Sequence, residues 1–426
     1  MKPEIKTCLA QIRAGEIPQG YKNTPIGILK SDWSYAKLNE IVDILTETAG
    51  KKQYETLSIS AGMGFVNQAK KFGKELSGKQ YEKYIVLRKG DFSYNKGNSK
   101  AYPQGCIYRL NDRAEAAVPN VFESFRIANG YPEYYEQLFI AGFLNSQLYR
   151  FINHGIRDDG LLNLTEKDFY SCIVPVPPLE EQQRIASILS AQDKVIELCE
   201  RKIEQLKRMK KYYLQNMFPK DGEEYPEIRF KGFTDSWKQR KIDELVEFYS
   251  GLTYKPEDVT ENGTLVLRSS NVKNSEIVLT DNVYVDESVV NSTNVKKDDI
   301  IIVVRNGSKA LIGKHAKIRH SMPNTVIGAF MTGLRSDSSD FINALLSTEI
   351  FDKEIKMNMG ATINQITGYM FANMEFMTPS FQERQAVGSF FSRLDHLITL
   401  HQRKCEEEKK KKKALQQLLL TGLVRV

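Results

Sequence analysis

Two long stretches of the chain carry apolar side chains at steps of three and four residues. That spacing predicts amphipathic helices, because it gathers the apolar positions on one helical face. The first stretch spans residues 180–217, follows Pro177 and Pro178, and ends before Pro219. The apolar positions are Ile185, Ile188, Leu189, Val195, Ile196, Cys199, Ile203 and Leu206, then Val387, Phe390, Phe391, Leu394, Leu397, Ile398, Leu400, Leu415, Leu418 and Leu419. We expect two long helices that form an antiparallel coiled coil; ordinary amphipathic helices within globular domains are the alternative.

Both stretches belong to an internal repeat with a period of 202 residues. Fifteen of the 41 positions from 177 to 217 are identical to the positions 202 residues later, where unrelated segments would share roughly two or three. A second match, at an offset of 204, aligns Trp33 with Trp237, and we expect both to anchor the core of a module. The repeat predicts four parts: a first module at 1–178, a central helix at 179–220, a second module at 221–379 and a C-terminal helix at 380–426.

Between the repeated segments the two copies share little similarity, over residues 43–143 and 247–345. A duplicated frame that holds divergent inserts favours two units with the same task and different targets.

Charge and composition are compatible with a nucleic-acid partner and argue against a secreted or membrane protein. The net charge of +7 permits a nucleic-acid partner, although residues 221–378 are acidic, with 18 Lys and Arg against 23 Asp and Glu. Basic residues concentrate instead at 70–100 and 296–320. Five scattered cysteines, none spaced as Cys-x-x-Cys, indicate reduced thiols. No secretion signal or apolar run long enough for a bilayer is evident, so we expect a cytoplasmic protein without a membrane partner.

The sequence offers no credible catalytic site. The run at 307–315 resembles a phosphate-binding loop, but its glycines are one residue too far apart and His315 replaces the hydroxyl that would bind magnesium. The five histidines do not combine with Asp or Cys at metal-ligand spacing. We therefore expect a non-catalytic protein with no cofactor and no metal.

Polar, basic loops that follow short strands are the candidates for DNA contacts. Lys and Arg meet phosphates, while Asn and Arg can bind base edges through two hydrogen bonds. The candidates are Lys96, Asn98, Ser99, Lys100 and Tyr102 in the first module, and Arg305, Asn306, Ser308, Lys309 and Lys314 in the second. Both loops follow a Lys-x-Asp segment and could be equivalent; a solvated surface role is the alternative for each residue.

The repeated frame resembles the specificity subunit of type I restriction–modification systems. Its most specific motif is Val-Pro-Val-Pro-Pro-Leu-Glu-Glu-Gln-Gln-Arg-Ile-Ala at 174–186, which leads into the first long helix. The second copy, Thr-Pro-Ser-Phe-Gln-Glu-Arg-Gln-Ala-Val at 378–387, has Arg384 where the first has Gln182. The segment from 225 to Trp237 is similar to the start of a module in that family, and the segment from Tyr21 to Trp33 is a variant of it.

The resemblance implies a mixed α/β fold with two target-recognition domains related by approximate two-fold symmetry. Each domain would read one half of an asymmetric, bipartite DNA target, and the helices would set the spacing. Two methyltransferase subunits would be partners, and restriction subunits could join. S-adenosylmethionine would bind the methyltransferase, so this chain needs no cofactor.

Two other classes of function stay open. A coiled-coil protein-interaction scaffold would keep the helices without sequence-specific DNA binding. A stand-alone methylating or cleaving enzyme would need a nucleotide, metal or methyl-donor motif that the sequence does not offer.

Overall fold

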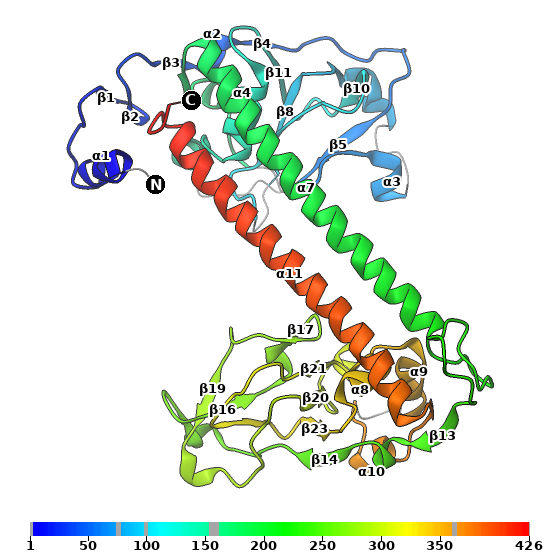
Figure 1. Ribbon diagram of the computed structural model, residues 1–426. Helices are drawn as coiled ribbons and strands as arrows, with labels where there is room; N and C mark the ends of the chain where they lie inside the picture. The colour runs from blue at the N-terminus through cyan, green and yellow to red at the C-terminus, as the bar shows by residue number, and fades with distance from the viewer. Residues whose placement is uncertain (1–2, 74–77, 98–100, 153–161, 360–363, 426) are drawn as a thin grey trace. The chain divides into compact units, whose positions relative to one another are not determined.

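The chain forms two compact units in the computed structural model, which describes residues 3–73, 78–97, 101–152, 162–359 and 364–425. Unit 1 contains the residues up to Leu198 together with those from Cys405 onward, and unit 2 contains Cys199–Lys404. Two long helices, α7 (Leu179–Asn216) and α11 (Phe381–Leu419), each contribute one part to each unit (Figure 1). Both predicted long helices are therefore present.

Unit 1 is built around a four-stranded antiparallel sheet, which we call its frame sheet. Its order is β4 (Val42–Ile44), β11 (Glu123–Ile127), β8 (Phe92–Asn95) and β9 (Cys106–Arg109). A separate pair joins β3 (Ser34–Lys37) to β12 (Ile173–Val176), directly before α7. The helices of this frame are α2 (Leu38–Ile41), α4 (Pro132–Ile140), α5 (Asn145–Phe151) and α6 (Glu166–Tyr170). The buried core between them is rich in aromatic rings, and Trp33 is fully buried in it.

The insert of unit 1 forms smaller sheets beside the frame sheet (Figure 1). These are the hairpin β5 (Leu57–Ser60) with β6 (Gly64–Asn67), and the pair β7 (Ile85–Arg88) with β10 (Glu115–Val118). Short helices α3 (Gln68–Phe72) and η1 (Gly78–Lys83) lie between them in the chain. Before the frame come α1 (Pro3–Arg13) and a hairpin of β1 (Tyr21–Thr24) and β2 (Gly27–Lys30).

Unit 2 repeats the frame of unit 1. Its frame sheet has the order β14 (Glu247–Ser250), β23 (Met331–Arg335), β20 (Ile300–Val303) and β21 (His315–Lys317), again antiparallel. The pair before α11 is β13 (Lys238–Lys241) with β24 (Glu375–Thr378). The helices are η2 (Ile242–Glu244), α8 (Ser339–Leu345), α9 (Glu349–Asn358) and α10 (Gly368–Ala372). Trp237 is buried where Trp33 is buried in unit 1.

The insert of unit 2 has a different topology. A second four-stranded sheet has the order β15 (Val259–Thr260), β19 (Val283–Val285), β16 (Thr264–Leu267) and β22 (Thr325–Ile327), in which β16 and β22 are parallel. A short hairpin joins β17 (Val272–Lys273) to β18 (Glu276–Ile277). The 3-10 turns are η3 (Pro256–Asp258), η4 (Ser269–Asn271), η5 (Glu287–Val289) and η6 (Lys309–Leu311).

Each unit closes its core with the start of one long helix and the end of the other. In unit 1, Ile185 and Leu189 of α7 share a buried cluster with Leu419 of α11. In unit 2, Val387 and Phe391 of α11 share a cluster with the residues that follow α7. The two ends of each helix are thus fixed by apolar burial, within the unit to which each end belongs.

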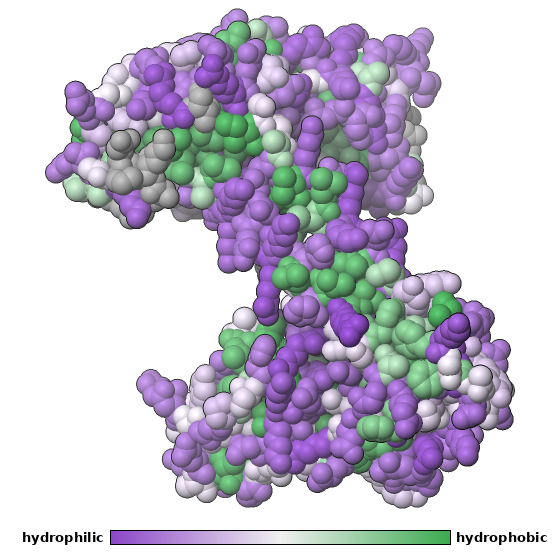
Figure 2. Space-filling model, viewed as in Figure 1, coloured by the Kyte–Doolittle hydropathy of each residue, from purple (hydrophilic) through white to green (hydrophobic). Residues whose placement is uncertain are grey.

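The surface shown in Figure 2 is mainly hydrophilic, with apolar areas that include parts of the two long helices. None of the helices in the described part of the chain is both long enough and apolar enough to span a bilayer.

Candidate nucleic-acid interface

A buried aspartate stands at the turn that leads into the central strand β8 or β20 of each frame sheet. Asp91 accepts a hydrogen bond from Arg126 Nε at 2.6 Å, and Asp299 accepts one from Arg335 Nε at 3.1 Å. Each carboxylate also accepts a backbone N–H from its own turn. The arginines come from the neighbouring strands β11 and β23, so the two turns are equivalent. The loops that follow β8 and β20 therefore leave their frame sheets at equivalent positions.

The β8–β9 loop holds the candidates of the first module. The Lys96 ammonium forms an ion pair with Glu123 at 2.5 Å, and both side chains are largely enclosed. The Tyr102 ring packs against the apolar cluster of the insert. Asn98, Ser99 and Lys100 lie outside the described residues. The two described candidates are thus engaged in contacts within unit 1.

The β20–β21 loop holds the candidates of the second module and presents them together. Arg305 is exposed, and its guanidinium lies 5.1 Å from the centroid of the Phe330 ring. Asn306 Nδ2 donates to Ser269 Oγ at 3.1 Å, and its Oδ1 accepts the backbone N–H of Ser308 at 3.0 Å. Ser308 and Lys309 are exposed, and Lys314 is half-buried just before β21. This loop therefore offers cationic donors on the surface, while the Asn306 amide stabilises the loop itself.

A buried glutamate near the start of each long helix connects the helix to its module. Glu181 accepts a hydrogen bond from Trp33 Nε1 at 2.9 Å and pairs with Arg425 at 3.4 Å. Glu383 accepts two hydrogen bonds from Arg229, both at 2.7 Å. The segment after α11 therefore makes in unit 1 the ion pair that the segment after α7 makes in unit 2.

The likeness between the segment 21–33 and the segment 225–237 is not preserved in the structure. Residues 21–30 form the hairpin β1–β2, whereas the structure assigns no strand or helix to 225–237. Arg425, which follows α11, makes the pairing with Glu181 that corresponds to the pairing of Arg229 with Glu383 in unit 2.

The two junctions also differ at one repeat-equivalent position. Gln182 donates to the Pro177 carbonyl at 2.8 Å and accepts the Tyr131 backbone N–H at 2.8 Å. At the equivalent position, Arg384 has a buried Nε without a hydrogen-bond partner among the described residues. Desolvation lowers the pKa of this guanidinium from its ordinary value. Hydrogen bonding at this repeat position is therefore less complete in unit 2 than in unit 1.

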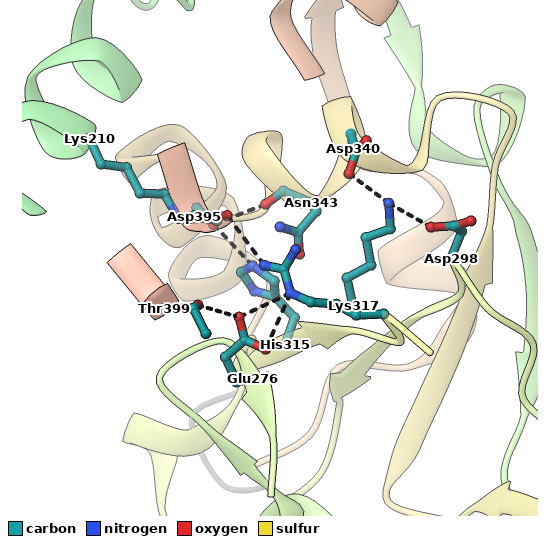
Figure 3. A network of polar contacts seen from close by, with 11 residues as sticks. Lys210, Glu276, Asp298, His315, Lys317, Asp340, Asn343, Asp395 and Thr399 are labelled. Carbon is teal, nitrogen blue, oxygen red and sulfur yellow. Dashed lines mark hydrogen bonds and ion pairs between the residues drawn. The ribbon is translucent and has the colours of Figure 1, made fainter. Parts of the chain in front are cut away.

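A network of polar contacts anchors the frame sheet of unit 2 to the long helices (Figure 3). Arg319, directly after β21, donates to Glu276 of β18 at 3.0 Å and lies 4.0 Å from Asp395 of α11. Glu276 also accepts from Thr399 at 3.2 Å, and Asp395 pairs with Lys210 of α7 at 2.6 Å. Because these groups come from β18, α7, α11 and the segment after β21, they hold the edge of unit 2 that contains β18 and β21 against both helices.

His315 is a structural residue of this edge. Its ring nitrogens lie 3.1 Å from the Gly313 carbonyl and from Ser347 Oγ, and burial lowers its pKa to about 4. Lys317, two residues later, pairs with Asp298 and Asp340. Within the described ranges, no group of three or more His, Cys, Asp and Glu could hold a metal ion.

Comparison with known proteins identifies the frame. The family model for the type I restriction modification DNA specificity domain matches residues 30–208 and, again, residues 234–409. The chain belongs to the family of type I restriction–modification specificity subunits. The MjaVIII specificity subunit of Methanocaldococcus jannaschii is 28% identical over 287 residues, which cover 65% of this chain and 68% of that subunit.

Other matches extend over nearly the whole chain. The putative MjaX specificity subunit of the same organism is 24% identical over 439 residues, with 96% of this chain and 97% of the relative covered. The crystal structure of an S subunit from M. genitalium superposes with a TM-score of 0.58 at 16% identity, over 91% of this chain and 96% of that one. The mixed α/β fold with two domains is thereby confirmed.

Sequence reasoning missed the surroundings of the β20–β21 loop. Phe330 and the polar turn at 268–270 are far from Arg305 in the chain but adjacent to its loop in the structure. A signal was available, since the run Arg-Ser-Ser-Asn at 268–271 follows the buried strand β16. Only the parallel pairing of β16 with β22 makes that run a neighbour of Phe330.

Proposed function

We propose that this specificity subunit has no catalytic activity of its own and that each unit reads one half of a bipartite, asymmetric DNA target. The observation that carries the proposal is the contrast between matched frame sheets and unmatched inserts. Equivalent turns at Asp91 and Asp299 project equivalent loops, while different inserts surround them. Matched frames give both units the same manner of approach to DNA, and different surroundings give them different sequences to recognise.

The two long helices would set the distance between the half-sites. Two ion pairs support an antiparallel helix pair: Asp193 of α7 with Lys412 of α11 at 2.5 Å, and Asp395 of α11 with Lys210 of α7 at 2.6 Å. These pairs are equivalent under the 202-residue repeat, so each copy supplies the aspartate of one pair and the lysine of the other. Such reciprocal pairing is what an approximate two-fold axis between the helices would produce.

The helices would also dock two methyltransferase subunits, to which restriction subunits could be added. Val195 and Leu198 of α7 are 39% and 63% exposed, and the repeat-equivalent Leu397 and Leu400 of α11 are 42% and 52% exposed. Apolar surface is visible on both helices in Figure 2. Exposed apolar side chains at equivalent positions of both copies favour two copies of one partner, because each copy offers the same surface.

The proposal is tested by mapping DNA methylation in cells that hold the partner methyltransferase, with and without this chain. A bipartite methylated motif that appears only with the chain is the expected result. If a stable complex forms and no motif appears, the protein-interaction scaffold becomes the better account.

The docking surface is tested by Leu198→Lys and Leu400→Lys in the full chain. Each single variant should lower the stoichiometry from two bound methyltransferases to one, measured by native mass spectrometry. Leu279→Lys is the matched control, because Leu279 is 54% exposed and lies outside both helices. Two bound copies in the double variant would reject this surface.

A further inference from the structure

A recess lies beside the β20–β21 loop of unit 2. Its volume is about 550 Å³, and its lining comes from residues that follow β14, β16 and β22, together with Asp281. Because β16 and β22 are parallel, the residues that follow them leave the sheet at the same edge. Arg268, Ser269 and Ser270 follow the first of these strands, and Phe330 lies shortly after the second. The recess therefore opens where two strand ends and the β20–β21 loop meet.

Arg305 contacts this recess through Phe330, which is part of the lining. Its guanidinium lies over the Phe330 ring, and the backbone N–H of Arg305 donates to the Phe330 carbonyl at 3.3 Å. The Phe330 side chain is itself 53% exposed, so the stacked pair is presented to solvent. The ring limits the directions in which the guanidinium can point, which lowers the conformational entropy lost when it binds a ligand.

Arg305 differs from the arginines around it. Arg268 pairs with Asp281 at 2.8 Å, Arg319 with Glu276 at 3.0 Å and Arg335 with Asp299 at 3.1 Å. Among the described residues, no carboxylate lies within ion-pair distance of Arg305. Its donors are therefore available to an outside acceptor.

The geometry favours a base over a phosphate. A guanidinium presents two parallel N–H donors, which match the O6 and N7 acceptors of guanine in the major groove. A phosphate contact needs charge but little orientation, and the exposed Lys309 in the same loop supplies that. The position of the Arg305 guanidinium over the Phe330 ring, with the recess next to that ring, suits the approach of a base edge.

We propose that Arg305, held against Phe330, reads a guanine in the half-site recognised by unit 2. This inference rests on the proposed function, and it adds the base and the side chain that reads it. Asn306 is a positioning residue in this account, because its amide is bonded to Ser269 and to the loop backbone.

The test uses the full chain in its complex with the partner methyltransferase, and it compares the wild type with Arg305→Lys by mapping methylated sites. Lysine keeps the charge and loses the paired donors. The variant should relax one guanine position in one half-site, with discrimination reduced on the order of 10- to 100-fold. The other half-site should be unchanged. Phe330→Ala should relax the same position to a smaller extent.

Three outcomes would overturn the inference. The half-site that unit 2 reads has no G·C pair, or Arg305→Lys keeps full discrimination at every position, or the variant weakens binding equally on all sequences, as the loss of a phosphate contact would. Arg240→Lys is the matched control, because Arg240 is an exposed arginine of β13, pairs with Glu244, and should leave the motif unaltered. If the wild-type complex gives no motif at all, the proposed function itself fails.

Discussion

The frame sheets of the two units have the same strand order, whereas the sheets of their inserts have different strand orders. In unit 1 the insert consists of two-stranded sheets, and in unit 2 it is a four-stranded sheet with a parallel pair. The frame contains the buried tryptophan, the buried aspartate of the turn and the junction with the long helix. These features fix the place from which a loop projects, and the insert decides what surrounds that loop. Under the proposed function, the frame positions the DNA-binding loop of each unit, and the insert supplies the surroundings that differ between the two half-sites.

The largest expected effect concerns the two tryptophans. Replacement of Trp33 or Trp237 by Ala should each lower the free energy of unfolding by about 3–5 kcal/mol, because both are fully buried. Replacement of each tryptophan by Phe should lower the free energy of unfolding by different amounts in the two units. Trp33→Phe removes a hydrogen bond to Glu181, whereas Trp237 Nε1 has no hydrogen-bond partner among the described residues. Trp33→Phe should therefore cost about 1–2 kcal/mol more, measured by denaturant unfolding. Equal losses would contradict this difference.

The two reciprocal ion pairs should contribute unequally to the free energy of unfolding. Asp395→Asn should cost about 3 kcal/mol, because the side chain is 13% exposed and faces both Lys210 and Arg319. Asp193→Asn should cost about 1 kcal/mol, because that side chain is 40% exposed. Thermal unfolding of matched variants measures the difference. If the two losses are the same, the polar network of Figure 3 adds nothing to unit 2.

Acid should weaken unit 2 through His315. Its pKa in the folded protein is about 4, below the ordinary value of 6.5, so folding favours the neutral ring. This contribution is complete above about pH 6.5 and is lost as the pH falls toward 4, a loss of about 2–3 kcal/mol. Hydrogen exchange of the β20 and β21 amides across this range measures it. His315→Gln should flatten the dependence, while His320→Gln, at an exposed site, should leave it unchanged.

A smaller effect on stability is expected at one repeat position, where the two long helices have different residues. Gly388 of α11 takes the repeat position of Ala186 in α7. A Cβ at Gly388 would lie 2.6 Å from the Phe341 backbone nitrogen, so α8 packs closely on α11 there. Gly388→Ala should therefore cost about 1–2 kcal/mol in spite of the helix propensity of alanine. Ala186→Gly should cost about 1–2 kcal/mol, from the lower helix propensity of glycine and the loss of a buried methyl group. If Gly388→Ala instead stabilises the protein, α8 can move away from α11 and the close contact does not require glycine.

The sequence was informative where a pattern is local or repeated. The helical spacing and the 202-residue repeat predicted α7 and α11, and the second match at an offset of 204 predicted the paired tryptophans, because amphipathic periodicity and duplication can be read directly from the chain. The Lys-x-Asp segments indicated equivalent loops, and Asp91 and Asp299 give that equivalence a structural basis.

The remaining features depend on contacts between distant residues. Nothing local to Lys96 indicates its pairing with Glu123, and nothing local to Arg305 indicates the Phe330 ring. The role of Arg425 in unit 1 depends on a contact between the segment after α11 and Glu181, which are far apart in the chain. Which of the candidate residues contact DNA stays a prediction.

The most direct test of the account is an exchange of one insert. Residues 43–143 are replaced by the equivalent segment of a relative that directs methylation to a different motif, and methylated sites are mapped in cells that hold the partner methyltransferase. The account predicts that one half-site changes to that of the relative, while the other half-site and the gap between them stay the same. A change in both half-sites, or in the gap, would contradict two independent readers in one duplicated frame.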